Sequence, residues 1–281
     1  MSLFHAVVLA LVQGLTEFLP VSSTAHLYLF PWLLGWPDGG IAFDAALHAG
    51  TLVAVLFFYL RTWVLLLLNG VGVRFPADAT EEEFRGNRRL FWLLVAGTIP
   101  AGIVGLVFEG VIERWLRNPL PIAIALIAGG LLMALVDAAP GLLRTLKGIN
   151  LSDSLAIGTA QALALIPGVS RSGITITAGL WRKLTRETAA EFSFLLSTPV
   201  IAAAAIKEIP RLIRMQQAGT IDLAPSTLLI AIAVSGLVGY GVIAFFLRYL
   251  QTRTLKIFIV YRISFGIVIL LLLFLHRGTA R

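Results

Sequence analysis

A short polar stretch, "LPVSSTAHL" at residues 19 to 27, interrupts the apolar N-terminal part of the chain. Pro20 ends one helical segment, and the hydroxyls that follow can cap the next, so free backbone amides should face a gap. Glu17 precedes this stretch, and a carboxylate near a hydroxyl can act as a general base for a nucleophilic serine or for water. We expect Ser22, Ser23 and Thr24 to line a polar gap, with Ser23 as the candidate nucleophile.

A second polar stretch, "PGVSRSGIT" at residues 167 to 175, has the composition of an anion-binding turn. Pro167 ends a helix, Gly168 relieves the backbone, and Ser170 or Ser172 can cap the next helix, so that several N–H groups point into the gap. Arg171 adds a planar fork that suits two phosphate oxygens. The alternative is that Arg171 only forms a structural ion pair with Glu17.

Glu17 has three possible roles. Gln13 lies four residues earlier on the same helix face, and the two oxygen-bearing side chains could hold Mg²⁺ or Ca²⁺ bound to a pyrophosphate. Glu17 could instead act as the general base. It could also bond the serines for packing alone.

Two further residues are candidates for contact with an anion. His26 follows Ser22 by one helical turn and could donate a proton to a leaving phosphate, although a structural role fits equally well. Arg262 lies in the middle of an apolar segment and could offer a second positive charge, or pair with Glu191 or Asp137. The other histidines have no such neighbourhood and are expected to be bystanders: His5, His48 and His276.

The composition sets the environment of these residues. The chain of 281 residues is 58% hydrophobic and 13% charged, with a mean hydropathy of +0.90, which indicates a polytopic membrane protein. The absence of cysteine excludes disulfides and thiolate chemistry. A net charge of +7 does not indicate nucleic-acid binding, because the basic residues lie in short clusters between apolar segments.

We predict a single all-α membrane domain over residues 1–281. Six windows are long enough to cross a bilayer: about 43–68, 88–109, 120–138, 187–210, 225–248 and 254–275. Two other apolar regions, 2–34 and 152–182, are broken near Pro20 and at Pro167-Gly168 into pieces too short to span. Non-helical backbone is tolerated at membrane depth only where protein groups or a water-filled cavity provide hydrogen bonds for its N–H and C=O groups. We therefore expect two re-entrant helix-loop-helix hairpins.

The two broken regions look like copies. A shift of 148 residues places Gln13 on Gln161, and Ser22 on Ser170. Each hairpin with the three spans after it would form one repeat, about 1–138 and 150–275, and an odd number of crossings would invert the second repeat. Chance similarity of two apolar segments is the alternative.

Basic residues favour one orientation. If the loop 69–88 is cytoplasmic, most of the other arginines and lysines at span ends fall on the same side, as the positive-inside rule requires. Those residues are Arg144, Lys147, Arg182, Lys183, Arg186, Arg248, Arg253 and Lys256.

The motifs "QGLTEFLPVSSTAHL" and "PGVSRSGIT" resemble the two signatures of the undecaprenyl-pyrophosphate phosphatases of the UppP/BacA type, and the resemblance covers essentially the whole chain. It implies a multi-pass enzyme of the bacterial inner membrane that removes the terminal phosphate of a C55 polyprenyl pyrophosphate, recycles the lipid carrier of cell-wall synthesis and confers bacitracin resistance. It also implies six spans, two re-entrant hairpins, inverted repeats and a possible homodimer.

The resemblance also assigns roles. It implies that Glu17 is the essential glutamate, Ser23 the nucleophile and His26 the motif histidine, and that Gln13 stands where relatives carry glutamate or glutamine. The residues that it implies for phosphate binding are Ser22, Thr24, Ser170, Arg171, Ser172, Thr175 and Arg262.

Two other classes share parts of this pattern. Transporters, flippases and anion channels also build sites from broken helices in inverted repeats, although a carboxylate such as Glu17 would repel an anion in its path. Membrane acid phosphatases with a histidine nucleophile need a histidine shortly after the arginine, where this chain has Thr175.

Overall fold

The computed structural model describes residues 1–139, 141–218 and 223–279, with the side chains of 109–116 and 276–279 excepted. Eleven α-helices and two short 3₁₀ turns make up this part of the chain, and no β-strand occurs in it. The all-α prediction is therefore confirmed. His276 lies outside the described side chains.

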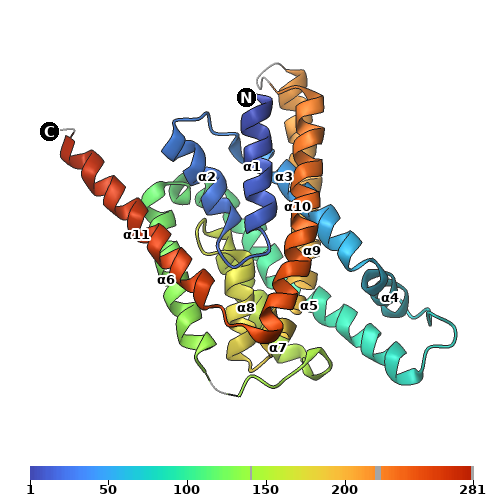
Figure 1. The fold of residues 1–281 in the computed structure, drawn as a ribbon. Coiled ribbons are helices and arrows are strands. Elements are labelled where there is room, and N and C mark those ends of the chain that lie inside the picture. Colours follow the sequence, from blue (N-terminus) through green and yellow to red (C-terminus); the bar gives the residue numbers. More distant parts are fainter. Residues whose placement is uncertain (140, 219–222, 280–281) are drawn as a thin grey trace.

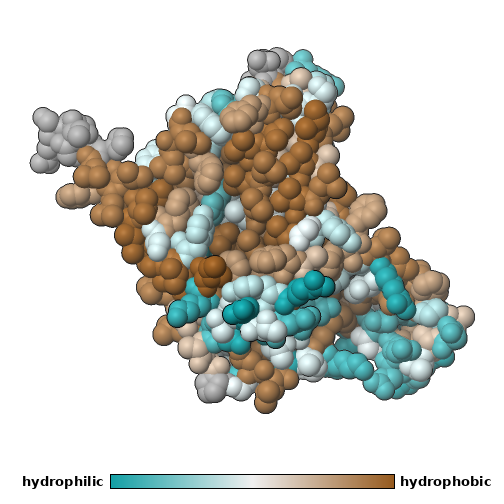
Figure 2. Space-filling view, in the orientation of Figure 1, coloured by the Kyte–Doolittle hydropathy of each residue, from teal (hydrophilic) through white to brown (hydrophobic). Residues whose placement is uncertain are grey.

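Six helices are long and apolar enough to cross a membrane, as the sequence predicts (Figure 1). They are α3 (Gly40–Phe58), α5 (Glu81–Leu116), α6 (Pro119–Asp137), α9 (Arg186–Gln217), α10 (Pro225–Thr252) and α11 (Lys256–Thr279). Large apolar side chains remain exposed on their outer faces, and Figure 2 shows this hydrophobic surface over α10 and α11. A lipid environment accounts for such a surface.

The predicted window 43–68 is wrong in one respect, because it contains two helices. Helix α3 ends at Phe58, Tyr59 leaves the helical conformation (φ −102°, ψ 25°), and α4 (Leu60–Gly70) begins in a new direction. The side chain of Tyr59 is buried in the main core, while α4 packs against α5. Hydropathy alone cannot detect a one-residue break within a continuous apolar run.

The predicted loop 69–88 is also shorter than expected. Thr80 caps α5 by accepting a hydrogen bond from the Glu83 backbone N–H, and the Glu83 side chain returns a bond to Thr80. This capping box and the acidic first turn start α5 at Glu81, because negative charge stabilises a helix N-terminus.

Four short helices form two helix-loop-helix pairs. Helices α1 (Leu3–Thr16) and α2 (Ser23–Leu34) make the first pair, which we call hairpin 1; α7 (Leu151–Ala162) and α8 (Arg171–Trp181) make hairpin 2. Each helix has 11 to 14 residues, which is short of the roughly 20 needed to span. In Figure 1 the loops of both hairpins lie in the middle of the helix bundle.

Helix packing brings the hairpins together. Helix α1 packs against α10 and α7 against α5, while α3 packs against α9, and α6 against α11. Close contact between α7 and α5 needs glycine, because a Cβ on Gly158 would lie 2.0 Å from the carbonyl oxygen of Gly97.

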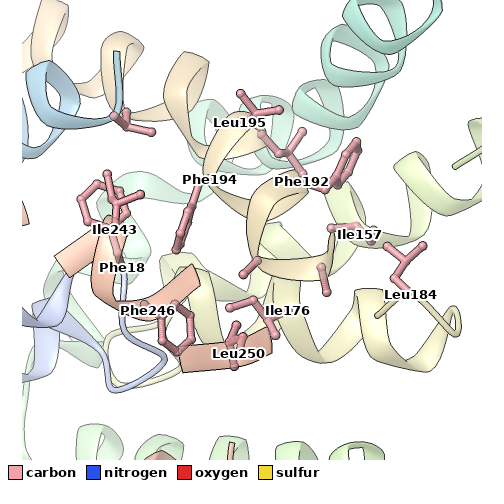
Figure 3. Packing of buried hydrophobic residues seen from close by; sticks show 14 of the residues in the cluster. Phe18, Ile157, Ile176, Leu184, Phe192, Phe194, Leu195, Ile243, Phe246 and Leu250 are labelled. Carbon is pink, nitrogen blue, oxygen red and sulfur yellow. The ribbon is translucent and has the colours of Figure 1, made fainter. Parts of the chain in front are cut away.

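The main core lies directly behind the hairpin 1 loop. Phe18 is buried there, with its ring edge-on to that of Phe194 at a centroid distance of 5.2 Å (Figure 3). Phe246 extends this aromatic contact. Because Phe18 is anchored in the core, the neighbouring Glu17 is fixed relative to α9 and α10.

One end of the molecule carries a network of ion pairs. Asp153, at the start of α7, accepts hydrogen bonds from Arg144 and Arg182 at 2.5 to 3.1 Å. Burial acts to raise the pKa of Asp153, but the hydrogen bonds from Arg144, the Asn150 backbone and Arg182 outweigh it and lower the pKa to about 2. At the same end Arg186 binds Asp137, which also accepts from the Leu255 N–H.

Candidate active site

A cavity of about 330 Å³ lies where the two hairpin loops meet. Hairpin 1 contributes Glu17, Ser22, Ser23 and Thr24, and hairpin 2 contributes Gln161, Ser170 and Arg171. Helices α3 and α9 close the cavity with His48, Lys207 and Glu208, and Arg117 lies after the end of α5. The two motifs, which lie about 150 residues apart in the sequence, therefore share one cavity.

Glu17 and Arg171 are in direct contact across this cavity. The guanidinium Nη2 of Arg171 donates to Oε1 of Glu17, and the Glu17 side chain is only 2% exposed. Nη1 of Arg171 is buried and has no hydrogen-bond partner among the described residues. The ion pair that was the alternative reading of Arg171 does form, but it leaves part of the fork available to an anion.

The other oxygen of Glu17 is surrounded by donors. Ser23 Oγ donates to Oε2 at 2.5 Å and Gln13 Nε2 donates at 2.8 Å. A hydroxyl held this closely by a carboxylate is oriented to lose its proton to that carboxylate. Glu17 itself caps the C-terminus of α1, so its backbone is fixed by a hydrogen bond to the Gln13 carbonyl.

The loop serines cap the helices that follow them. Ser22 accepts from the Ala25 N–H at 3.4 Å and Ser170 from the Gly173 N–H at 3.1 Å. Both serines have positive φ, 75° and 72°, which is uncommon outside glycine. The N-termini of α2 and α8 thereby reach the cavity, and such ends favour negative charge.

Arg262, which was expected to contact an anion or to form a structural pair, does not line the cavity. Its guanidinium is fully buried outside the cavity lining and donates to the carbonyl oxygens of Pro20, Gly168 and Val169 at 2.8 to 3.2 Å. Of the two suggested partners, Asp137 pairs instead with Arg186. Arg262 satisfies carbonyl groups that the helix breaks leave free, and so it joins the loops of the two hairpins.

His26 is likewise not placed with the reacting groups. Its Nδ1 bonds to the Ser22 carbonyl at 2.7 Å and its Nε2 to the Tyr261 hydroxyl at 2.6 Å. The ring is 1% exposed and stacks near Phe265 outside the cavity. This geometry favours the structural alternative, in which His26 links α2 to α11.

Two predicted phosphate ligands also point elsewhere. Ser172 Oγ donates to the Leu19 carbonyl at 2.9 Å, which ties hairpin 2 to hairpin 1. Thr175 Oγ1 bonds to the Arg171 carbonyl and to Ser193 Oγ. Neither side chain lines the cavity. The Thr175 bond is the back-bond to the preceding turn that is common for hydroxyls inside a helix.

His48 is a site residue that the sequence analysis dismissed. Its Nε2 lies 3.2 Å from Glu17 Oε2, and its Nδ1 bonds to the Asp44 carbonyl at 2.7 Å. His48 belongs to α3, and only tertiary packing brings that helix to hairpin 1. The sequence has no local signal for this contact.

The mouth of the cavity carries an ion-pair cluster that was also missed. Arg117 donates to Asp38 at 2.9 Å and to Asp44 at 3.0 Å, and its guanidinium lies over the Tyr28 ring. This cluster joins the α2–α3 loop to the segment after α5. It gives the cavity a charged rim.

The donor chemistry beside Glu17 is compatible with a divalent cation. Oε1 of Gln13 is buried and has no hydrogen-bond partner among the described residues, so one neutral oxygen is available next to one carboxylate. Oxygen ligands of this kind suit Mg²⁺ and Ca²⁺. No group of three His, Cys, Asp or Glu side chains that could hold a metal occurs in the described part of the chain.

The fold and the cavity define a multi-pass membrane protein with a polar cavity between two broken-helix hairpins. The chain belongs to the family described as "Bacitracin resistance protein BacA", whose model matches residues 6–268. Similar proteins are named undecaprenyl-diphosphatase. One from Geobacter metallireducens is 45% identical over 275 residues, covering 98% of this chain and 99% of the relative. One from Moorella thermoacetica is 42% identical over 277 residues, covering 99% of this chain and all of the relative.

Proposed function

We propose that this protein is an undecaprenyl-diphosphatase of the bacterial inner membrane. It hydrolyses undecaprenyl pyrophosphate to undecaprenyl phosphate and inorganic phosphate, which recycles the lipid carrier for cell-wall synthesis. The name shared by its relatives and the family support this activity. Bacitracin resistance follows when the enzyme is abundant, because less pyrophosphate lipid remains for the drug.

The observation that carries the proposal is the contact of Glu17 with both Ser23 and Arg171 in one cavity. Arg171 and the N-termini of α2 and α8 bind the negatively charged headgroup. Positioning and charge neutralisation are the main contributions that a protein makes to phosphoryl transfer.

In the chemical step, Ser23 Oγ attacks the terminal phosphorus while Glu17 accepts the hydroxyl proton. The bond from phosphorus to the bridging oxygen breaks, and its electron pair leaves with undecaprenyl phosphate. Glu17 passes this proton to the departing undecaprenyl phosphate and is ionised again. Water then attacks the phosphoserine while Glu17 accepts a proton from it, the bond from phosphorus to Ser23 Oγ breaks, and Ser23 Oγ takes that proton from Glu17 as inorganic phosphate leaves. Direct attack by a water that Glu17 activates is the alternative sequence of events.

A divalent cation is part of the proposal. Glu17 and Gln13 Oε1 would hold it together with oxygens of the pyrophosphate. When bound, it would supply charge neutralisation for the phosphate oxygens.

The cavity is proposed to open to the outer side of the inner membrane. Its rim contains Arg117, Asp44 and Lys207. This rim lies at the end of the molecule opposite the basic cluster that includes Arg144 and Arg182. The positive-inside rule places that basic cluster in the cytoplasm. Apolar residues in the cavity wall from α5 and α9, such as Ala101 and Val200, leave a lipid-compatible path for the polyprenyl tail.

We further propose that hairpins 1 and 2 are re-entrant and belong to inverted repeats. The positive-φ cap serines, Ser22 and Ser170, are 148 residues apart, as are Gln13 and Gln161. Under the 148-residue shift α7 corresponds to α1 and α10 to α5. Helix α1 packs on α10 and α7 packs on α5, so each hairpin contacts a helix of the other repeat, as expected of two related halves. A homodimer stays a prediction, which light scattering of the purified protein in detergent checks.

The test is phosphate release from undecaprenyl pyrophosphate by the purified protein in detergent. Wild type should release phosphate, whereas Glu17→Gln and Arg171→Ala should be nearly inactive. Both variants should still show a cooperative melting transition, which demonstrates that they are folded. Thr177→Val is a matched control, because Thr177 is buried in hairpin 2 but bonds only to the Gly173 carbonyl. A folded wild-type protein that releases no phosphate would contradict the proposal and favour a transporter or flippase.

A further inference from the structure

Gln161 has an unsatisfied side chain in the wall of the cavity. It lies near the C-terminal end of α7, is 2% exposed and lines the cavity between the hairpins. Its Nε2 and Oε1 are both buried, and neither has a hydrogen-bond partner among the described residues. A buried amide without partners is costly, so its retention here calls for a ligand that the protein's own groups do not provide.

The shift of 148 residues explains why Gln161 has no partner. Its counterpart in hairpin 1, Gln13, donates to Glu17, but the position that corresponds to Glu17 in hairpin 2 is Leu165. Leu165 also lines the cavity and cannot accept a hydrogen bond. The amide donor of Gln161 therefore remains available where that of Gln13 is used.

Hairpin 2 contributes a second unused donor to the same cavity. Nη1 of Arg171 is buried without a partner, while Nη2 of the same residue binds Glu17. One guanidinium N–H group and one amide N–H group thus remain for an acceptor-rich ligand. Phosphate oxygens fit both donors, and the Gln161 Oε1 can accept from a phosphate hydroxyl or from water.

Each hairpin is positioned to bind a different phosphate group of the diphosphate. Glu17 and Ser23 belong to hairpin 1, so the terminal phosphate must lie against hairpin 1 to react. The phosphate that stays on the lipid is then the one left for Gln161. We propose, resting on the diphosphatase function above, that Gln161 binds the lipid-side phosphate and makes the site selective for diphosphates over monophosphates.

Gln161→Leu tests this assignment, because leucine removes both polar atoms at similar volume. KM for undecaprenyl pyrophosphate should rise about tenfold, a ratio typical of one lost hydrogen bond to a charged group, with a smaller change in kcat. The melting temperature of the unliganded variant should not fall, since an unpaired buried amide has been removed. Gln161→Asn should recover part of the affinity, and Thr177→Val should leave KM unchanged.

Binding of simple anions separates this inference from the proposed function. Inorganic pyrophosphate and inorganic phosphate are each added to the purified protein, and the rise in melting temperature is measured. Gln161→Leu should lose much of the stabilisation by pyrophosphate but keep the stabilisation by phosphate. Gln161→Glu, which keeps the shape but adds a repelling charge, should lose more of the pyrophosphate effect and provides a second variant if leucine prevents folding.

Three outcomes would overturn the assignment. An unchanged KM in both Gln161→Leu and Gln161→Glu would show that the amide touches no substrate. A lower melting temperature with normal KM would show a purely structural role. An equal loss of the stabilisation by pyrophosphate and by phosphate in Gln161→Leu would indicate that Gln161 contacts the terminal phosphate. The anion-binding outcome does not depend on whether wild type releases phosphate, so it separates failure of this assignment from failure of the diphosphatase function.

Discussion

Ser23 Oγ donates a hydrogen bond of 2.5 Å to Glu17 Oε2, and the acceptor carboxylate is held from its other side by Arg171. The proposed nucleophile and its proposed base are thus in contact in the absence of substrate. Ser23→Ala should lower kcat by about 10³-fold with little change in KM, within the range that loss of a positioned general-base partnership produces. Rapid acid quench with labelled substrate should trap phosphoserine in wild type. If Ser23→Ala retains most activity while Glu17→Ala does not, a water molecule is the nucleophile.

Arg171→Lys keeps a positive charge but loses the planar fork. Lysine can pair with Glu17 or reach the phosphate, whereas Arg171 has separate nitrogens for the two. We expect kcat/KM to fall about 10- to 100-fold, measured by phosphate release. Arg182→Lys, a change in the ion-pair network around Asp153, is the control and should be close to wild type. Full activity in Arg171→Lys would show that charge alone suffices.

Arg262→Met should destabilise the protein and weaken catalysis together. It leaves the carbonyl groups of Pro20, Gly168 and Val169 without their donor, at a cost of about 3 kcal/mol or more. The melting temperature in detergent and kcat should both fall, because the two loops lose their common anchor. A variant with unchanged stability but raised KM would instead support the original prediction of substrate contact.

Stability at low pH should depend on Asp153. Its pKa of about 2 in the folded protein lies below the value of about 4 for an unfolded aspartate, so its ionised form stabilises the fold. That contribution is complete above about pH 4 and is lost as the pH falls from there towards 2. The melting temperature of wild type should fall through this window, whereas that of Asp153→Asn should be lower at neutral pH and change less. Parallel curves for the two proteins would contradict the assignment.

Removal of divalent cations should lower activity, and Mg²⁺ or Ca²⁺ should restore it. Gln13→Glu places a second carboxylate beside Glu17, so it should reduce the cation concentration required for half-maximal phosphate release. The measurement is a titration of each cation into chelator-treated protein. Activity that is indifferent to chelator, in wild type and in Gln13→Glu, would remove the cation from the proposal.

Much of the fold follows from local patterns. Runs of apolar residues locate the six long helices, and the prolines at 20 and 167 locate the breaks between short ones. The break at Tyr59 was missed because it lies within a run that stays apolar. Side-chain type therefore predicts where a helix can exist more reliably than where it bends.

The residues of the candidate site were harder to predict from sequence than the helices. Polar side chains are rare in an apolar chain, so Glu17, Ser23 and Arg171 at the helix breaks could be singled out from the sequence, and the structure places all three in one cavity. Arg262 stands out in the same way, but its partners are backbone carbonyls, which the sequence does not reveal. His48 was dismissed because its contact with Glu17 depends on how α3 packs against hairpin 1.

The position of Arg262 within the chain has a consequence for biogenesis. Helix α11 follows every other described helix, yet it supplies the group that bonds to both hairpin loops. While the ribosome is still synthesising the region before residue 256, those carbonyls have no guanidinium to accept from, and the loops lack their common anchor. Hydrolytic competence is therefore expected only after the last helix has entered the bilayer, which keeps partly inserted chains from acting on the lipid carrier.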